Sequence, residues 1–400
     1  MLNKAGLLAM VIVVGVCVAA HAAESIEITA GFAVGPDESR FAAGLLRLAA
    51  QQVPGVVIAY DDATTAQSYG GMDGRFRDHG ALTDIVFLYS GRTSLLDEIP
   101  GLARAGLIQP VDRLPGYQKH VRPDDIYPNL IDSVEADGHV WAVPVRVCPP
   151  CLAVRKDIEA TPDSWDRFLA IAGEHQFVRS LDSDMYMLWL TLLAQRGATQ
   201  FHRGLYDFSE PVFHESFRTI QTLSASCIGE TPTPAGIALV TADDIGGASE
   251  LRAETRLCPF PAADTGDVFH GENVWYVGVS SEVAGTRRRV LAELLGALLS
   301  PDVQLEIGKR TYSPPVRPSI AASRAFRAAY PDGSPQAAAA AMTPRLRFRQ
   351  SGLLAEKTEH IIERAFRSAL GSPGSFDETM AEAARQANQV ILGHSQEGTQ

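Results

Sequence analysis

The sequence lacks the short motifs that mark the common catalytic and nucleotide-binding sites. It contains no GxGxxG, no P-loop, no GxSxG and no HExxH pattern. Its histidines are scattered, and no two of them are four positions apart, which is the spacing that would put two imidazoles on one helix face. We therefore expect no enzyme activity, no metal site and no cofactor.

Long apolar runs are also scarce, and the one that stands out is at the start. Lys4 precedes an apolar stretch at 5–20, and Ala20-His21-Ala22 is the small-x-small pattern that signal peptidase cleaves. The run is shorter than the roughly 20 residues that span a bilayer. We expect residues 1–22 to be a signal peptide and the protein to be periplasmic. A lipid anchor at Cys17 is the alternative.

Positive charge is in deficit. The chain has 35 Lys and Arg against 47 Asp and Glu, a formal net charge of −12. An acidic surface argues against nucleic acids and anionic membranes as partners, and is compatible with a small neutral ligand. Without residues 1–22 the chain still has 378 of its 400 residues. This length exceeds what one hydrophobic core usually supports, so we expect two lobes.

Cysteine is rare. Four of the five cysteines lie beyond the signal peptide, and in an exported protein they predict disulfides. Pairing Cys148 with Cys151 and Cys227 with Cys258 is the simplest arrangement, although crossed pairings stay open. The CPPC motif would also suit a thiol–disulfide exchange site. The residues after it, 152–154, continue as a strand rather than a helix, which favours an inert disulfide.

Alternating strand and helix patterns open the mature chain. Strands are expected at 25–35, 56–60 and 84–89, with a helix from Asp37 between the first two. This order predicts a parallel α/β sheet. Ligands of such sheets bind beyond the carboxyl ends of the strands.

The stretch at 140–158 connects two halves of the chain. An apolar strand leads into Pro144 and the CPPC motif, and a second apolar strand follows. Asp137-Gly138, just before it, predicts a two-residue hairpin turn. Further on, we expect a strand at 274–279 and helices at 185–195, 212–226, 286–299, 320–329, 336–341, 353–370 and 376–392.

With these landmarks in order, the chain resembles the extracellular solute-binding proteins of ABC importers, in particular the sugar-binding group that includes maltose-binding protein. The resemblance extends from residue 25 to about 392. It is carried by DIVFLYSGRTSLLDEIPGLARAGLIQPVD (84–112), IYPNLIDSVEADGHVWAVPV (126–145), LAVRKDI (152–158), ENVWYVGVSS (272–281) and LLSPDVQLEIGKRTYSPPVRPS (298–319).

The resemblance implies a two-lobed periplasmic binding protein fold with three hinge crossovers, near 143–151, 271–276 and 311–317, followed by C-terminal helices. Lobe 1 would comprise 23–146 plus 275–312, and lobe 2 would comprise 147–274 plus 313–400. The implied function is to bind a small solute, a carbohydrate in this group, by hinge closure and to deliver it to an ABC permease. Members of this group are usually monomers.

The resemblance also assigns ligand contacts residue by residue. For Trp189 and its neighbour Tyr186, plain core packing is an equal alternative, and Arg146 could instead be ion-paired. Two other functions stay open, a periplasmic thiol–disulfide protein using Cys148 and Cys151, and a sensor or accessory protein. The assigned contacts are Phe32, Asp37, Glu38, Tyr89, Ser90, Arg146, Trp189, Asn273, Trp275 and Arg317.

Overall fold

The structure is a computed structural model of the 400-residue chain. Two predictions, the signal peptide at 1–22 and the ligand contact at Asn273, lie outside the described residues. The structure describes residues 25–33, 36–60, 83–90, 98–175, 177–178, 183–202, 204–228, 236–241, 254–261, 269–270, 274–347, 355–372 and 374–397.

The first sheet begins with three parallel strands, which confirms the order predicted from the sequence. Strand β1 (Ile26–Ala33) lies between β2 (Val56–Tyr60) and β3 (Ile85–Ser90) and runs parallel to both. Ile28 and Ala30 are fully buried, because alternate residues of a strand face the same side of the sheet.

Antiparallel strands complete this sheet. Strand β16 (Val274–Ser280), which is buried throughout, pairs with β3 on one side. On its other side it pairs with β7 (Ala142–Val147) and β4 (Ile108–Gln109). Two stretches that are far apart in the sequence therefore share one sheet.

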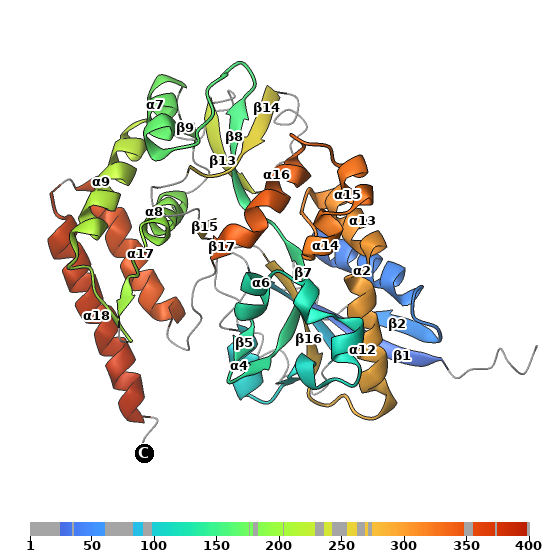
Figure 1. The fold of residues 1–400 in the computed structure, drawn as a ribbon. Coiled ribbons are helices and arrows are strands. Elements are labelled where there is room, and N and C mark those ends of the chain that lie inside the picture. The colour runs from blue at the N-terminus through green and yellow to red at the C-terminus, as the bar shows by residue number, and fades with distance from the viewer. Residues whose placement is uncertain are drawn as a thin grey trace, which may run out of the picture.

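Helix α2 (Pro36–Ala50) packs against β1 and β2 and against α12 (Thr286–Leu298) and α13 (Pro301–Thr311). Figure 1 shows these helices beside the first sheet. The other elements of this part are α4 (Glu98–Arg104), η2 (Val111–Arg113), α5 (Tyr117–His120), η3 (Pro123–Asp125), α6 (Pro128–Asp132), β5 (Glu135–Ala136) and β6 (His139–Val140).

The turn of the β5–β6 hairpin is at the position expected from the sequence. Asp137 and Gly138 have φ angles of 54° and 72°. Positive φ at both central residues is what a type I′ turn requires, and Asp-Gly is among the pairs that adopt it most readily.

The second sheet has β8 (Pro150–Arg155) between two antiparallel neighbours, β13 (Ile237–Thr241) and β14 (Thr255–Cys258). Beyond β13 it continues through β9 (Phe177–Val178) and β12 (Cys227–Ile228). The chain thus passes from the first sheet into the second between the end of β7 and the start of β8.

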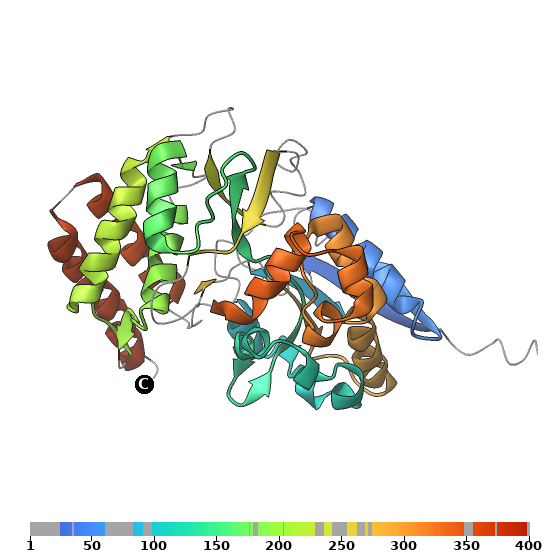
Figure 2. The same ribbon diagram turned by 45° about the horizontal axis from the view of Figure 1, so that its top comes forward.

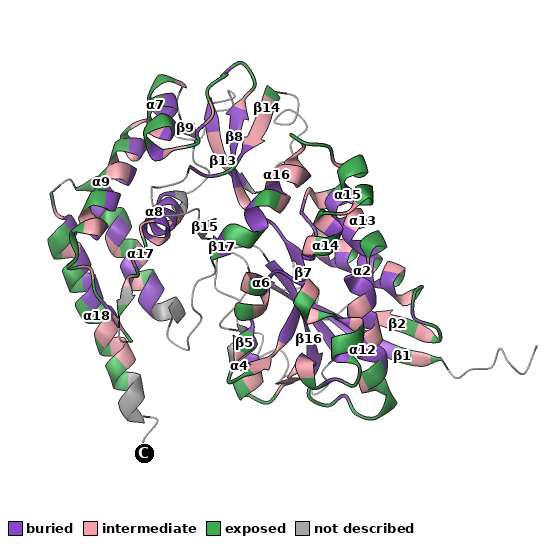
Figure 3. Ribbon diagram, in the orientation of Figure 1, coloured by how far each residue is buried: buried purple, intermediate pink, exposed green. Residues whose placement is uncertain are grey.

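A group of helices lies beside the second sheet, with α7 next to β13 and the last two helices of the chain packed on the others (Figures 1 and 2). Their inward faces are buried together with the central strands of both sheets (Figure 3). These helices are α7 (Trp165–His175), α8 (Ser183–Gln195), α9 (Pro211–Ala225), α17 (Ala355–Gly371) and α18 (Phe376–Glu397), with β10 (Phe201–His202) and β11 (Leu205–Tyr206) between α8 and α9.

The chain after α13 contacts both halves of the molecule. Gln336 in α16 donates to the Gly308 carbonyl of α13 at 3.0 Å, whereas Met342 at its other end packs beside Cys151 of β8. The predicted helix at 320–329 is split in two by Ser323, which caps the second piece. The elements here are α14 (Pro318–Ala321), α15 (Arg324–Ala329), α16 (Pro335–Met342), η4 (Thr343–Arg345) and β17 (Leu346–Arg347), which pairs with β15 (Phe269–His270).

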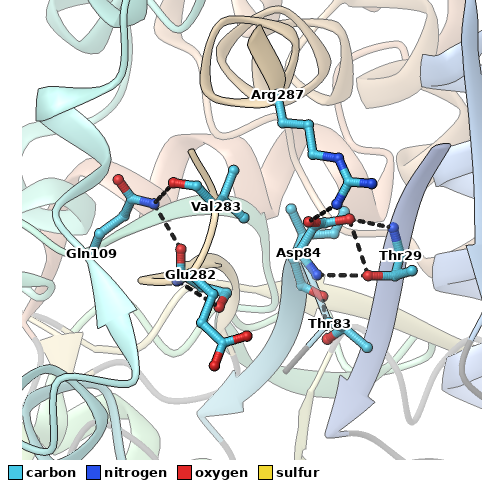
Figure 4. A network of polar contacts seen from close by, with 9 residues as sticks. Thr29, Thr83, Asp84, Gln109, Glu282, Val283 and Arg287 are labelled. Carbon is cyan, nitrogen blue, oxygen red and sulfur yellow. Dashed lines mark hydrogen bonds and ion pairs between the residues drawn. The ribbon is translucent and has the colours of Figure 1, made fainter. Parts of the chain in front are cut away.

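A polar network fastens the first sheet at the amino-terminal end of β3 (Figure 4). The Asp84 carboxylate accepts from the backbone N–H and the hydroxyl of Thr29, at 2.8 and 3.0 Å, and from Arg287 of α12 at 3.2 Å. Gln109 of β4 donates to the carbonyl of Ser280 at 2.7 Å. Hydrogen bonds to a carboxylate are among the stronger ones in proteins, so this network stabilises that end of the sheet.

Strand β7 contains a bulge near its carboxyl end. Trp275 of β16 pairs with Arg146, but the next residue pairs with Pro144, so Val145 is the extra residue. A bulge next to proline is expected, since proline has no N–H for the ladder. The Val145 carbonyl accepts instead from the Gln304 side chain of α13 at 3.0 Å.

The same buried amide of Gln304 reaches two more segments. Its Nε2 also donates to the Leu298 carbonyl at 3.1 Å, and its oxygen accepts from the Val316 N–H at 3.0 Å. The side chain is 1% exposed. One glutamine therefore joins the first crossover strand, the end of α12 and the segment after α13.

The cysteines differ from the expectation. Within the part of the chain that the structure describes, Cys148, Cys151 and Cys258 are buried and form no disulfide; the Cys227 side chain is not described. Cys148 precedes a proline, and a residue in this position is held extended, which disfavours the tight ring that a disulfide to Cys151 would close.

The two thiols of the CPPC motif contact different residues. The Cys148 sulfur lies 3.0 Å from the hydroxyl oxygen of Ser313. Cys151 packs with Val240 and Met342, and burial raises the pKa of its thiol well above the usual value. A thiol–disulfide exchange site needs an accessible thiol with a lowered pKa, which Cys151 does not provide.

We predict that Gln304→Leu destabilises the protein. The substitution would leave the Val145 and Leu298 carbonyls and the Val316 N–H buried without their partner. Its free energy of unfolding should fall by about 2–4 kcal/mol, measured by urea denaturation. The control is Gln118→Ala at an exposed position of α5, expected to change it by less than about 0.5 kcal/mol. Equal effects of the two substitutions would contradict the bridging role.

We also predict that the protein, purified without reductant, contains buried thiols. At pH 8 the native protein should react slowly with a thiol reagent, because burial and a raised pKa keep Cys151 protonated. In guanidinium chloride at the same pH, at least the three described cysteines should react. Fewer than three reactive thiols after denaturation would mean that a disulfide forms in solution.

Candidate functional site

Three of the predicted ligand residues lie in one row across the first sheet. Trp275 of β16 pairs with Tyr89 of β3 on one side and with Arg146 of β7 on the other. Strands β1, β3 and β7 run in the same direction, so their carboxyl ends are at one edge, where β16 begins. The following pairs, Ser90 and Val147 with Val274, form the end of that edge.

Arg146 is the charged member of the row, and it is 2% exposed. Its guanidinium carbon lies 4.5 Å from the centre of the Trp275 ring and 5.9 Å from that of Phe41, on α2. Its Nε donates to the hydroxyl of Ser313 at 3.0 Å. Contacts with the two rings stabilise the charge by about 0.5–2 kcal/mol each.

Trp275 has apolar contacts around its ring and an unsatisfied nitrogen. It is fully buried, and Phe41 and Phe87 make edge contacts with it at 5.8 and 6.5 Å between ring centres. Among the described residues its Nε1 has no hydrogen-bond acceptor. An indole N–H can only donate, so the site presents a buried donor beside a guanidinium.

Ser313 links this site to the segment after α13. Its buried hydroxyl accepts from Arg146 and lies 2.9 Å from the Thr311 hydroxyl and 3.0 Å from the Cys148 sulfur. The sequence showed no signal for Ser313, because its partners are distant in the chain. Phe41 lies in the helix expected from Asp37, but an apolar helical pattern does not distinguish core packing from a contact with a guanidinium.

Of the ligand contacts expected after the first strand, Phe32 lies in the core, whereas Asp37 and Glu38 lie in a helix. Phe32 is 3% exposed and packs in the core, where its ring lies 5.5 Å from that of Phe87 and 6.1 Å from that of Tyr60. Asp37 and Glu38 lie in the first turn of α2. The side chain of Glu38 is half-buried, and that of Asp37 is outside the description, as are those of Tyr89 and Ser90.

Trp189 lies within a cluster of aromatic side chains between the helices of the second sheet. Its ring stacks on Phe366 of α17 at 4.9 Å, and Tyr186 and Phe376 lie within about 6 Å of it. Trp189 and Tyr186 are both fully buried. Both side chains are therefore packed in the core, and the ligand contact expected at Trp189 stays a prediction.

Arg317 contacts the segment around Val121 rather than the Arg146 row. Its Nη2 donates to the Val121 carbonyl at 2.6 Å, while the next residues bond to Asp125 through Ser319. Burial lowers the pKa of the Arg317 guanidinium, and the Asp125 carboxylate opposes this effect. Arg317 and Ser319 together attach the segment after α13 to Val121 and to Asp125 of η3.

Within the described ranges, no group of three or more His, Cys, Asp and Glu side chains is arranged to hold a metal ion. None of the described helices is long and apolar enough to cross a membrane.

No family model matches the sequence, and no curated protein matches it. Solved structures do match. The sugar-binding protein MalE from Xanthomonas citri superposes with a TM-score of 0.77 at 14% identity, covering 94% of this chain and 100% of that one. The cyclic alpha-maltosyl-1,6-maltose binding protein from Arthrobacter globiformis gives 0.74 at 17% identity, covering 92% and 99%.

A third similar structure is UgpB from Mycobacterium tuberculosis, solved in complex with glycerophosphocholine. It superposes with a TM-score of 0.71 at 16% identity and covers 93% of this chain and 99% of that one. Together the three span nearly the whole described chain, both sheets included. The chain therefore has the two-lobed α/β fold of these solute-binding proteins, which confirms the fold predicted from its sequence.

Proposed function

We propose that this protein is the exported solute-binding component of an ABC importer. It would bind a small polar solute between its lobes, close around it and present it to the permease. The observation that carries the proposal is the pairing of Arg146 with Trp275 at the sheet edge where the chain crosses between the lobes. Ligands of open α/β sheets bind at this kind of edge.

The fold and the names of the similar structures support a sugar or a similar small polar solute as the ligand. Two similar structures are named for binding sugars or maltosides and one contains glycerophosphocholine. All of these are small solutes rich in oxygen atoms. A carbohydrate or a related polyol derivative is the solute class we propose, with a monomeric protein working in the periplasm after loss of residues 1–22.

Tyr89, Arg146 and Trp275 form the centre of the proposed ligand site, with Ser90 and Asn273 at its edge. Because Trp275 pairs with residues on both sides, a ligand that reaches this ring is also near β3 and β7. Phe32 packs against Phe87, Trp189 stacks on Phe366, and Arg317 bonds to the Val121 carbonyl, and these contacts favour supporting roles for the three.

The lobes that we propose follow the two sheets. Residues 23–146 with 275–312 would form lobe 1, and 147–274 with most of 313–400 would form lobe 2. Residues 316–319 bond to Tyr127, Val121 and Asp125, so we count them with lobe 1. The helices that follow would pass to lobe 2.

A solute library tests the proposal. We expect at least one sugar, polyol or small organic acid to raise the melting temperature, because a ligand at 100 times its Kd adds about 2.7 kcal/mol of stability. The same compound should lower the radius of gyration in small-angle scattering as the lobes close. A library without any stabilising compound, or binding without compaction, would contradict the proposal.

The variant Arg146→Lys tests whether the Arg146 guanidinium takes part in solute binding. Lysine keeps the positive charge but loses the planar group that stacks on Trp275, so we expect at least tenfold weaker binding of the compound found above. Arg289→Lys, at an exposed position of α12, is the control and should leave the affinity unchanged. If both variants bind equally well, Arg146 is not part of the site.

A further inference from the structure

We propose that the Asn129 side-chain amide is a latch between the two lobes. It lies on the face of the first sheet opposite the Arg146–Trp275 pair, and closure around a solute must break it. The inference rests on the proposed function and adds to it a contact that works against closure. Asn129 belongs to α6, in lobe 1, and its bonding partners belong to η4 and β17, which follow α16.

The contact consists of two hydrogen bonds from one side chain. The Nδ2 of Asn129 donates to the carbonyl of Thr343 at 2.9 Å and to the carbonyl of Leu346 at 2.8 Å. The Oδ1 of the same amide is buried and has no donor among the described residues. Since an amide oxygen is an acceptor, part of the bonding capacity of Asn129 is lost in this arrangement. The contact is therefore weaker than that of a fully satisfied amide and can be released at lower cost.

The segment that accepts these bonds is attached to the second sheet and its helices. Met342 directly precedes η4, is 1% exposed, and packs with Cys151 of β8 and Val240 of β13. Leu346 begins β17, which pairs with β15, and β15 packs on α8. Both ends of the accepting segment should therefore move with lobe 2.

Helix α6 is attached to the first sheet. The Ser133 hydroxyl at its end donates to the Leu130 carbonyl at 2.7 Å and lies 2.7 Å from the Tyr276 hydroxyl. Because a hydroxyl has only one hydrogen, Ser133 accepts from Tyr276, a buried residue of β16. At the start of α6, the Tyr127 N–H donates to the Val316 carbonyl at 3.2 Å. The helix that carries the latch should therefore move with lobe 1.

The latch and the proposed solute site lie on opposite faces of the first sheet. Trp275 and Arg146 contact Phe41 of α2. Tyr276, the next residue of β16, contacts α6 instead. Successive residues of a strand point to opposite faces, so α2 and α6 cover different faces of the sheet. A rotation about the crossovers that narrows the space on one face widens it on the other. Closure on the Trp275 face would therefore separate α6 from η4.

The variant Asn129→Ala tests the latch. It removes both hydrogen bonds, which stabilise only the open arrangement, so the closed arrangement becomes more populated. Two neutral hydrogen bonds are strong enough that their loss should raise the affinity for solute about tenfold. The probes are maltose and glycerophosphocholine, measured by calorimetry. Small-angle scattering without any probe should give a smaller radius of gyration than the wild-type protein has.

The matched control is Asn388→Ala. Asn388 of α18 also makes two hydrogen bonds to backbone, with the N–H and the carbonyl of Tyr206 in β11, but both elements lie in lobe 2. The control should lower stability in urea and leave the affinity and the radius of gyration unchanged. If circular dichroism shows that Asn129→Ala is unfolded, Asn129→Asp replaces it. Aspartate has nearly the same shape without the N–H donors, and the same changes are expected.

The outcomes separate the latch from the proposed function. If the Asn129 variant binds a probe no more tightly than the wild-type protein and has the same radius of gyration, the latch is overturned while solute binding stands. If neither probe nor any library compound binds, the proposed function fails. The scattering of the unliganded variants then decides the latch, because a smaller radius of gyration supports it and an unchanged one overturns it.

Discussion

The burial of the Arg146 guanidinium is the constraint on which the crossover region depends. Taking such a charge out of water costs several kcal/mol, so its neighbours must be fixed around it. Those neighbours are Trp275, near the start of β16, and Ser313, which is 167 residues away in the sequence. Side chains from all three connections between the lobes therefore meet at one group, and their relative positions are coupled.

The two ends of the first sheet differ in how their polar groups are hydrogen-bonded. At the Asp84 end, a carboxylate accepts three hydrogen bonds that join β1, β3 and α12. At the crossover end, β7 carries a bulge whose carbonyl accepts from Gln304, and the Trp275 Nε1 has no acceptor among the described residues. The first end therefore satisfies its polar groups with its own hydrogen bonds, whereas the second leaves a described donor unsatisfied.

Much of the fold was predictable from local patterns. Alternating apolar residues located β1 and β3, helical spacing located α12 and α17, and Asp137-Gly138 located the hairpin turn. These patterns depend on which positions are apolar rather than on which apolar residue occupies them. For this reason the same fold occurs in structures only 14–17% identical to this chain.

The sequence by itself determined that the first strands form a parallel unit and that the chain crosses between the two halves at the CPPC motif, and its resemblance to solute-binding proteins singled out Arg146 and Trp275. The tertiary structure alone decided that the two are strand neighbours, that Phe41 and Ser313 complete their surroundings, and that Trp189 is a core residue. It also decided that Cys148 and Cys151 are buried free thiols. The physical reason is that patterns report the burial of each position, whereas these outcomes depend on register and on contacts between segments distant in the chain.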